Sequence, residues 1–448
     1  MPKASNFDIV STRQQRIATL ARQSPQMGFT SLNHHIDFAW LHEAYRRTRK
    51  DGAVGIDGQS ASDYEENLES NLQSLLDRAK TGRYRAPAVR RVHIPKGDSG
   101  HETRPIGIPA FEDKILQRAV VMVLEAIYEQ DFHSCSYGFR PKRSAHQALD
   151  ALWQQTMQTG GGWILELDIQ KFFDTLDKSH LRMFLQHRVR DGVMLRLIGK
   201  WLNAGVLENR KLIYPKTGSP QGGVISPVLA NVYLHYVLDD WFVQEVLPRM
   251  RGKAFLVRYA DDAVFGFTNE EDARRVLEVL PKRFGKYGLT LHPDKTRLVP
   301  FQKPPARPRQ KEDPPGPGTF ELLGFTHLWA LSQKGNWVVK RKTAPSRFTR
   351  AVRAIARWCR TNRHRTIEEQ QRTLCQKMRG HFGYYGITGN SPALSRFHHE
   401  VRRIWRKWLS RRRRADRMPW SRFERLLEHY PLPRPIAVHS VCRHAANP

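Results

Sequence analysis

Two adjacent carboxylates occupy a short turn between two apolar segments. Asp261 and Asp262 follow the segment FLVR and precede AVFGF, and no glycine lies between them. Carboxylates near an apolar interior are costly unless a cation meets them, and a tight hairpin ordinarily uses Asn-Gly or Asp-Gly for backbone reasons. The pattern indicates a metal-binding turn, although an acidic surface turn would explain this pair if nothing else accompanied it.

A third carboxylate ends another apolar segment. Asp168 closes the alternating stretch WILELDI at residues 163–169. Two strands that each end in a carboxylate can converge on a pair of Mg²⁺ ions about 4 Å apart. One ion would activate a 3′-hydroxyl, and the other would neutralise charge on a triphosphate. The three carboxylates therefore favour nucleotidyl transfer, whereas Asp168 alone would be explained by a helix N-cap or a surface salt bridge.

The elements that must position these carboxylates mix helix and strand. Residues 1–85 have helical character, and a further helix is predicted at 111–128. Ser144 and Gln147 have the spacing of a capping box at the start of another helix. Alternation and turn residues predict a hairpin at 89–109, turning at 97–100, and strands at 163–169, 255–259, 263–267 and in the segment ELLGF.

The net charge of +31 points to a polyanionic partner, most simply nucleic acid. Residues 341–420 hold 22 Lys and Arg against four Asp and Glu, so the excess is concentrated near the C-terminus. Four scattered cysteines favour a reducing compartment. No run of 18 apolar residues occurs, and we therefore expect no membrane span.

Two basic amphipathic helices are predicted in this C-terminal region. One apolar face would be formed by Phe348, Val352, Ile355 and Cys359, with Arg350, Arg353, Arg357 and Arg360 opposite it. A second face would be formed by Leu394, Phe397, Val401, Ile404 and Trp408, surrounded by Arg402, Arg403, Arg406 and Lys407. Each helix would attach to a core on one side and bind RNA phosphates on the other. A solvated charged face is the alternative.

The chain resembles the reverse transcriptases, and the shared blocks occur in the order found in that family. The palm-like blocks are WILELDIQKFFDTLD, GSPQGGVISPVLANVYL, RYADDAVFGF, YGLTLHPDKT and FELLGF, and RPIGIP and SYGFRPKRSAHQAL resemble the fingers. The resemblance implies an α+β fold: a right-hand polymerase of fingers and palm, followed by an all-α basic thumb/maturase region. The implied domains are an N-terminal extension with the start of the fingers at 1–85, fingers and palm at 86–330, and thumb with maturase domain at 331–448.

The resemblance also implies roles for individual residues. Asp168, Asp261 and Asp262 would be the catalytic metal ligands, joined by the backbone of Ile169, and would bind two Mg²⁺ ions or Mn²⁺ in their place. The implied nucleotide-binding residues are Lys96, Arg104, Phe173, Gln221, Gly222 and Lys295. Phe173, five residues after Asp168, would exclude the ribose 2′-hydroxyl, with core packing as the alternative. Arg140 would touch the template RNA or support the fingers.

Further blocks resemble the bacterial group II intron-encoded reverse transcriptases, which are also maturases. These blocks are ETRPIGIPAFEDKILQRAVVMVLEAIYEQDF, SPQGGVISPVLANVYL and GHFGYYGITGNSPALSRFHHEVRRIWRKWLSRR. The resemblance implies splicing and retrohoming, with group II intron RNA, an RNA template with a DNA primer, dNTPs and a DNA target as partners. It also implies a cytoplasmic, nucleoid-associated protein, with a homodimer as one arrangement. Because no cysteine pairs occur, we expect no HNH endonuclease domain.

Three other functions compete with this interpretation. Diversity-generating, retron and CRISPR-associated reverse transcriptases share the palm, but the maturase-like C-terminal block argues against them. A splicing or RNA-binding factor with a decayed polymerase would have no reason to keep Asp168, Asp261 and Asp262 together. An RNA-dependent RNA polymerase is disfavoured by Phe173 at the expected sugar gate. Primer extension separates the active reverse transcriptases from the decayed polymerase.

Overall fold

The computed structural model describes residues 6–95, 103–209, 211–214, 217–218, 222–305, 317–412 and 418–439. The chain forms two compact units that are interleaved along the sequence. The first unit comprises Met1–Ala148, Leu167–Phe265 and Glu271–Arg297, and the second comprises Leu149–Glu166, Gly266–Glu270 and Leu298–Pro448. The division of the chain at 85 and 330 stays a prediction.

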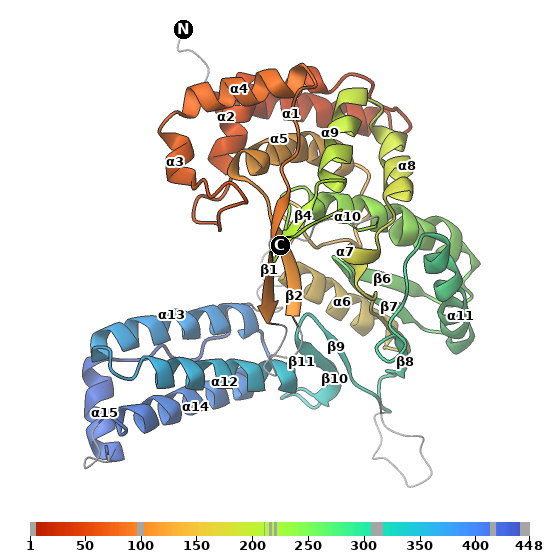
Figure 1. Ribbon diagram of the computed structural model, residues 1–448. Helices are drawn as coiled ribbons and strands as arrows, with labels where there is room; N and C mark the ends of the chain where they lie inside the picture. Colours follow the sequence, from red (N-terminus) through yellow and green to blue (C-terminus); the bar gives the residue numbers. More distant parts are fainter. Residues whose placement is uncertain are drawn as a thin grey trace. The chain divides into compact units, whose positions relative to one another are not determined.

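A long apolar helix organises the N-terminal part of the first unit. Helix α5 (Phe111–Tyr128) is buried on nearly every side, as expected for the run AVVMVLEAIY, and its bounds are those predicted. Helices α1 and α2 pack on it (Figure 1), and the indole of Trp40 donates a hydrogen bond to the carbonyl of Ala119 at 2.9 Å. The predicted helical start is confirmed by α1 (Asn6–Gln23), α2 (Phe38–Arg47), α3 (Ala61–Glu65) and α4 (Leu68–Lys80).

A four-stranded sheet of the first unit contains the predicted hairpin. Its strand order is β2-β1-β4-β5, with bounds Thr103–Ile108, Val89–Pro95, Val206–Glu208 and Lys211–Ile213. Strands β1 and β2 are antiparallel, and their register pairs Arg90 with Ile108 and Ile94 with Arg104. The hairpin at 89–109 is therefore confirmed, while its predicted turn at 97–100 lies outside the described residues.

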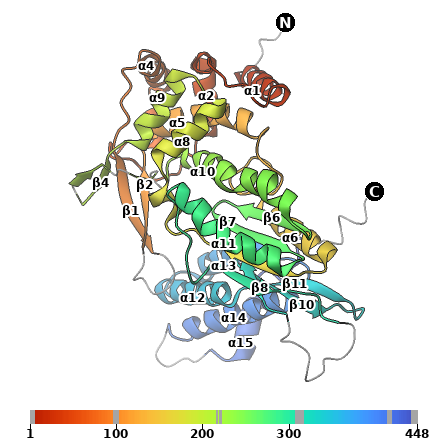
Figure 2. The same cartoon turned by 90° about the vertical axis from the view of Figure 1, so that its right-hand side faces the viewer.

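The carboxylate-bearing segments belong to a second four-stranded sheet, with the strand order β6-β7-β3-β8. Its strands are Ala254–Tyr259, Asp262–Phe267, Trp163–Leu167 and Arg297–Pro300, so the predicted strands on either side of the acidic turn are confirmed (Figure 2). The neighbouring helices of the chain are α6 (Ala145–Thr159), α7 (Phe172–Thr175), α8 (Lys178–Arg188), α9 (Gly192–Leu202), α10 (Ser226–Leu234) and α11 (Glu270–Lys286). Helix α10 continues into the π-helical turns His235–Asp239 and Phe242–Val246.

A three-stranded sheet of the second unit has the order β11-β10-β9, with bounds Trp337–Thr343, Phe325–Leu331 and Phe320–Leu322. The strand character predicted for ELLGF is confirmed on both sides of a turn, because the segment holds the end of β9 and the first residue of β10. Leu323 and Gly324 have φ angles of 52° and 79°, so the chain turns there and β9 pairs antiparallel with β10. Glycine at 324 allows this turn, because the left-handed region is open to it.

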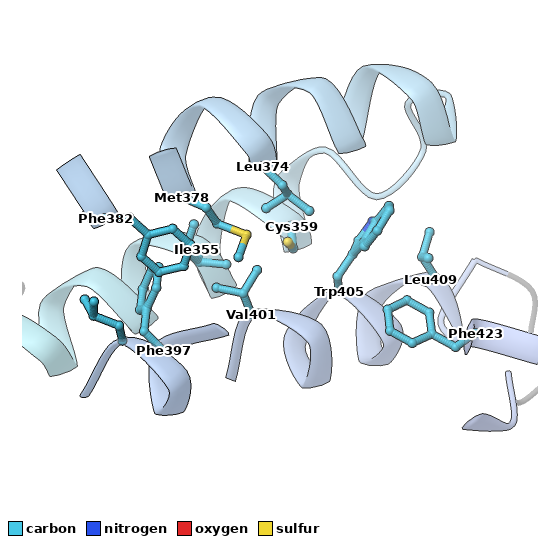
Figure 3. Packing of buried hydrophobic residues seen from close by; sticks show 11 residues of the cluster. Ile355, Cys359, Leu374, Met378, Phe382, Phe397, Val401, Trp405, Leu409 and Phe423 are labelled. Carbon is cyan, nitrogen blue, oxygen red and sulfur yellow. The ribbon is translucent and has the colours of Figure 1, made fainter. Parts of the chain in front are cut away.

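Four helices complete the second unit: α12 (Pro345–Thr361), α13 (Ile367–Tyr385), α14 (Ser391–Leu409) and α15 (Trp420–His429). They enclose the apolar cluster that Figure 3 shows, which includes Ile355, Cys359, Phe397 and Val401. The predicted apolar face of α14 is corrected near its C-terminal end. Trp405 and Leu409 are buried there, whereas Ile404 and Trp408 are only partly buried beside the cluster. Within the described residues, every helix is too short or too polar to cross a bilayer.

Candidate active site

The turn between β6 and β7 presents the two adjacent carboxylates at the end of a buried hairpin. The strand residues Phe255, Val257 and Phe265 are buried, and they anchor the hairpin in the core. Ala260 has a φ of 58°, a left-handed conformation that reverses the chain without a glycine. Asp261 is half-buried and Asp262 is exposed, so the two adjacent side chains meet different surroundings.

Asp168 is held by the segment that precedes β8. Its backbone carbonyl accepts a hydrogen bond from the His292 amide at 2.8 Å, and the hydroxyl of Thr296 lies 3.5 Å from the same carbonyl. The Lys295 ammonium lies 3.3 Å from Asp168 Oδ2. Because the Lys295 side chain is 54% exposed, the ion pair contributes little to stability.

The two carboxylates Asp168 and Asp261 are electrostatically coupled. Burial raises the pKa of Asp261 above its ordinary value, and the negative charge of Asp168 raises it further. A hydrogen bond from its own backbone and the cations Arg104 and Arg258 act in the opposite direction. A desolvated carboxylate beside a second carboxylate is favourable when a cation is bound, and this environment fits a metal ligand.

The donor set suits a hard divalent cation completed by substrate. Among the described residues, no three His, Cys, Asp or Glu side chains gather closely enough to form a ready-made metal cluster. Mg²⁺ is commonly bound by one or two carboxylates together with substrate phosphates, not by an all-protein cage. Asp168 and Asp261 fit this arrangement, and the buried Ile169, bridged to Leu291, fixes the backbone beside them.

Of the residues expected to bind the nucleotide, some lie within the described residues and others lie outside them. Arg104 is exposed on β2 and acts electrostatically on Asp261. Lys96 and Gln221 lie outside the described residues. Gly222 has a φ of 107°, and a Cβ added there would lie 2.6 Å from the carbonyl oxygen of Gly107. The described contact of this glycine is therefore with β2, whereas the sequence suggested close approach to substrate.

The two phenylalanines after Asp168 have different environments. Phe172 is buried and contacts Tyr233 and Phe173, with its ring centroid 5.3 Å from that of Phe173. Phe173 is half-buried at the start of α7, a helix that follows Lys171 in a left-handed conformation. Core packing is thus carried by Phe172, and Phe173 retains an accessible face.

The expected contact between Arg140 and template RNA is corrected. Its side chain is 4% exposed and pairs with Glu129 at 3.0 Å. Its guanidinium also donates to the carbonyls of His133 and Ser136 at 2.8 and 2.9 Å. Because these partners occupy a buried guanidinium, Arg140 supports the loop internally and offers no surface to RNA.

The basic helices expose some of their predicted cations to solvent and hold others, half-buried, in contacts within the second unit. Arg350, Arg353 and Arg357 are exposed along α12, and Arg403 and Lys407 are exposed on α14. Arg402 instead pairs with Glu424. Arg406 donates to the Met418 carbonyl at 2.9 Å, and its guanidinium carbon lies 4.2 Å from the centre of the Trp420 ring.

These contacts overturn one expectation about α14. We expected Arg402 and Arg406 to lie off the packing surface, so that replacing them would spare the fold. Both in fact fasten α15 and the segment before it to α14, because α15 packs against a side of α14 that the apolar pattern did not reveal.

Two residues that support the site were not among those predicted from the sequence. Arg258 is completely buried within β6, and Thr296 contacts the backbone of Asp168. A signal for Arg258 exists, because a charged residue inside an otherwise apolar strand must find buried partners. For Thr296 we find no such signal.

Comparison with known proteins identifies the family to which this site belongs. The model of the family "Reverse transcriptase (RNA-dependent DNA polymerase)" matches residues 94–327, slightly more than half of the chain. The chain therefore belongs to the reverse transcriptases, the RNA-directed DNA polymerases, which generally use divalent metal ions.

Individual relatives extend the match. Protein YkfC of Escherichia coli is 34% identical over 330 residues, covering 65% of this chain and 84% of that protein. The group II intron-encoded protein LtrA of Lactococcus lactis is 37% identical over 230 residues, which cover 49% of this chain and 37% of LtrA. The putative COX1/OXI3 intron 1 protein of Saccharomyces cerevisiae is 24% identical over 352 residues, which cover 68% of this chain and 41% of that protein. The resemblance to group II intron-encoded proteins is thereby confirmed.

Proposed function

We propose that the chain copies RNA into DNA at a site formed by Asp168, Asp261 and Asp262 with the backbone of Ile169. The observation that carries this proposal is the position of Asp168 directly after β3 and of the half-buried Asp261 directly before β7, two strands that are neighbours in one sheet. Two Mg²⁺ ions, or Mn²⁺ in their place, would activate the primer 3′-hydroxyl and neutralise charge on the triphosphate. The exposed Asp262 would contribute at the edge of this site.

The surrounding cations would orient the incoming dNTP. Arg104 would bind a phosphate through its forked guanidinium, and Lys96 would act beside it as a point charge. Lys295 would release Asp168 and bind the departing pyrophosphate, which its exposed ammonium makes feasible. The accessible face of Phe173 would lie beneath C2′ of the sugar and reject ribose. Gln221 and Gly222 would complete the pocket above that sugar.

We further propose that the chain has the right-hand architecture and binds group II intron RNA, thereby assisting splicing and retrohoming into a DNA target. The fingers would begin within 1–85, the fingers and palm would occupy 86–330, and the thumb and maturase domain 331–448. The exposed Arg350, Arg353 and Arg357, together with Arg403 and Lys407, supply a basic surface suited to RNA phosphates. A nucleoid-associated homodimer would be compatible with this role.

Primer extension by the full chain on an RNA template tests the polymerase proposal. Asp261→Ala should abolish cDNA synthesis in Mg²⁺, because it removes the half-buried carboxylate of the proposed metal site. Asp57→Ala, a change at an exposed loop carboxylate, is the matched control and should leave synthesis unchanged. A well-folded Asp261→Ala protein that still extends the primer would refute the metal assignment. A wild-type protein that binds intron RNA but never extends a primer would favour the splicing factor with a decayed polymerase.

A further inference from the structure

A buried guanidinium lies directly behind the catalytic turn. Arg258 in β6 is 0% exposed, as is its ion-pair partner Asp239 in the π-helical turn that follows α10. One guanidinium nitrogen, Nε, donates to Asp239 Oδ1 at 2.7 Å, and a second donates to the other carboxylate oxygen. The pair is therefore bidentate, the strongest geometry available to these two groups.

The remaining donors of Arg258 connect the turn to two other segments. Nη1 donates to the carbonyl of Ala260 at 2.9 Å and to Asn231 Oδ1 at 3.1 Å, and Nη2 donates to the hydroxyl of Ser136 at 2.7 Å. The Asn231 amide in turn donates to the Gly138 carbonyl at 2.8 Å. A single side chain thus joins β6, α10, the 136–138 loop and the turn that carries Asp261.

The helix geometry brings the two polar partners to the same guanidinium. Residues eight apart on a regular α-helix differ by about 80° in direction, which would separate Asn231 from Asp239. The π-helical turn over His235–Asp239 is wider and reduces that difference. Both side chains consequently reach Arg258, and the local irregularity of the helix has a structural consequence at the site.

Stability alone does not require this network. A buried ion pair is often no more stabilising than well-packed apolar residues of the same volume, and β6 is otherwise apolar. The network instead fixes the orientation of the Ala260 carbonyl. Ala260 is the residue with the left-handed φ immediately before Asp261. Without that hydrogen bond, the turn could relax toward a more common backbone conformation and carry the Asp261 carboxylate with it.

We propose that Arg258 is a positioning residue that holds the Ala260–Asp261 turn in its metal-binding conformation. This inference rests on the proposed polymerase function and deepens it. Arg258 touches neither substrate nor metal; it acts through the backbone of the turn, with Asp239, Asn231 and Ser136 setting its own orientation. Mutation should therefore affect metal binding and the chemical step, and leave the binding of the primer–template duplex unchanged.

Arg258→Lys in the full chain is the principal test. Lysine keeps the positive charge for Asp239 but cannot donate to Ala260, Asn231 and Ser136 at once. We expect kcat for primer extension to fall by about 100-fold with an unchanged dissociation constant for the primer–template duplex. Mn²⁺ binding, followed by electron paramagnetic resonance on the protein–duplex complex, should weaken by about 10–100-fold. This second measurement does not depend on turnover.

Arg188→Lys provides the matched control. Arg188 is also buried and ion-paired, to Asp131 at 2.9 Å, but it donates to the backbone carbonyls of residues 21–27 and not to the catalytic turn. It should lower the unfolding temperature while leaving Mn²⁺ affinity unchanged. If Arg258→Lys does not fold, Asn231→Ala removes one acceptor of Arg258, together with the donor to the Gly138 carbonyl, and preserves the Arg258–Asp239 pair. It should still weaken Mn²⁺ binding.

The outcomes separate the inference from the proposed function. Folded Arg258→Lys or Asn231→Ala proteins with wild-type Mn²⁺ affinity would overturn the positioning role, even if wild-type polymerase activity is normal. Equal losses of Mn²⁺ affinity in the Arg258 and Arg188 variants would overturn it as well, by indicating a general loss of structure. A wild-type chain that binds Mn²⁺ at Asp261 but extends no primer would refute the polymerase function alone.

Discussion

The close approach of Gly138 to the turn that precedes Asp261 leads to a prediction with a magnitude set by the structure. A Cβ added at Gly138 would lie 2.2 Å from the Ala260 amide nitrogen and 2.9 Å from the carbonyl carbon of Tyr259. Real Cβ atoms essentially never approach closer than 3.0 Å, so one of the two backbones must move by about 0.8 Å or more. Both colliding atoms belong to backbone, and rotation of a flexible side chain cannot relieve the clash.

We expect the turn, which is less buried than the 136–138 loop, to yield more readily, so Gly138→Ala should shift the backbone of Ala260, and Asp261 with it, by about 0.8 Å. A misplacement of about 1 Å can cost about 100-fold in rate, equivalent to about 2.7 kcal/mol of transition-state stabilisation. Single-turnover primer extension at saturating Mg²⁺ and dNTP measures this loss in the chemical step, and thermal unfolding reports whether the variant is folded.

Gly285→Ala is the control for this experiment. Gly285 lies in α11, and no atom would fall within 4 Å of an added Cβ there, so we expect a normal rate and a stability gain of about 0.5–1 kcal/mol. A folded Gly138→Ala protein with the wild-type single-turnover rate would show that the turn tolerates displacement. That result would remove the rigid-turn reasoning on which the magnitude rests.

Two further predictions concern substrate selection and RNA binding. Phe173→Val should raise ribonucleotide incorporation while retaining dNTP use, measured as the ratio of kcat/KM for a ribonucleotide to kcat/KM for the matching dNTP. Phe172→Ala should instead destabilise the fold by about 3–5 kcal/mol. Unchanged sugar selectivity in Phe173→Val would place the gate elsewhere. Replacing the exposed Arg350 and Arg357 with Ala should weaken binding to structured intron RNA and reduce the salt-dependence slope by about 1.4–1.8; an unchanged slope would mean that this face of α12 is merely solvated.

Local sequence signals determined much of what could be predicted. The capping box at Ser144 is confirmed, because the Gln147 amide donates to the Ser144 hydroxyl at 3.2 Å and the Gln147 side chain accepts from the Ser144 amide at 2.8 Å. The bounds of α5 and the two strands beside the acidic turn also follow from nearest-neighbour patterns. Each of these features depends on residues within a few positions of one another, where propensity and periodicity carry the information.

Features that depend on distant partners could not be predicted in the same way. Arg140, Arg402 and Arg406 were all expected at RNA-binding surfaces, yet each has internal partners that sequence spacing does not reveal. The sequence alone does not distinguish an arginine that faces solvent from one that pairs with a buried carboxylate. Arg258, in contrast, was not predicted to act at the site, because its role depends on contacts with Asp239, Asn231 and Ser136 that the sequence does not show.

The interleaving of the two units affects how the protein is made. Helix α6 belongs to the second unit from Leu149 onward, where its Trp153 indole donates to the carbonyl of Val339 at 2.8 Å and Asp150 pairs with Arg341. Trp153 and Val339 are 186 residues apart, so at ribosomal speeds of 5–20 residues per second the helix waits about 10–40 s for this partner to be synthesised. During that interval the side of α6 that packs against β11 lacks its partner. A fragment begun at residue 331 would lack the same helix, and would expose the β11 surface that Trp153 covers.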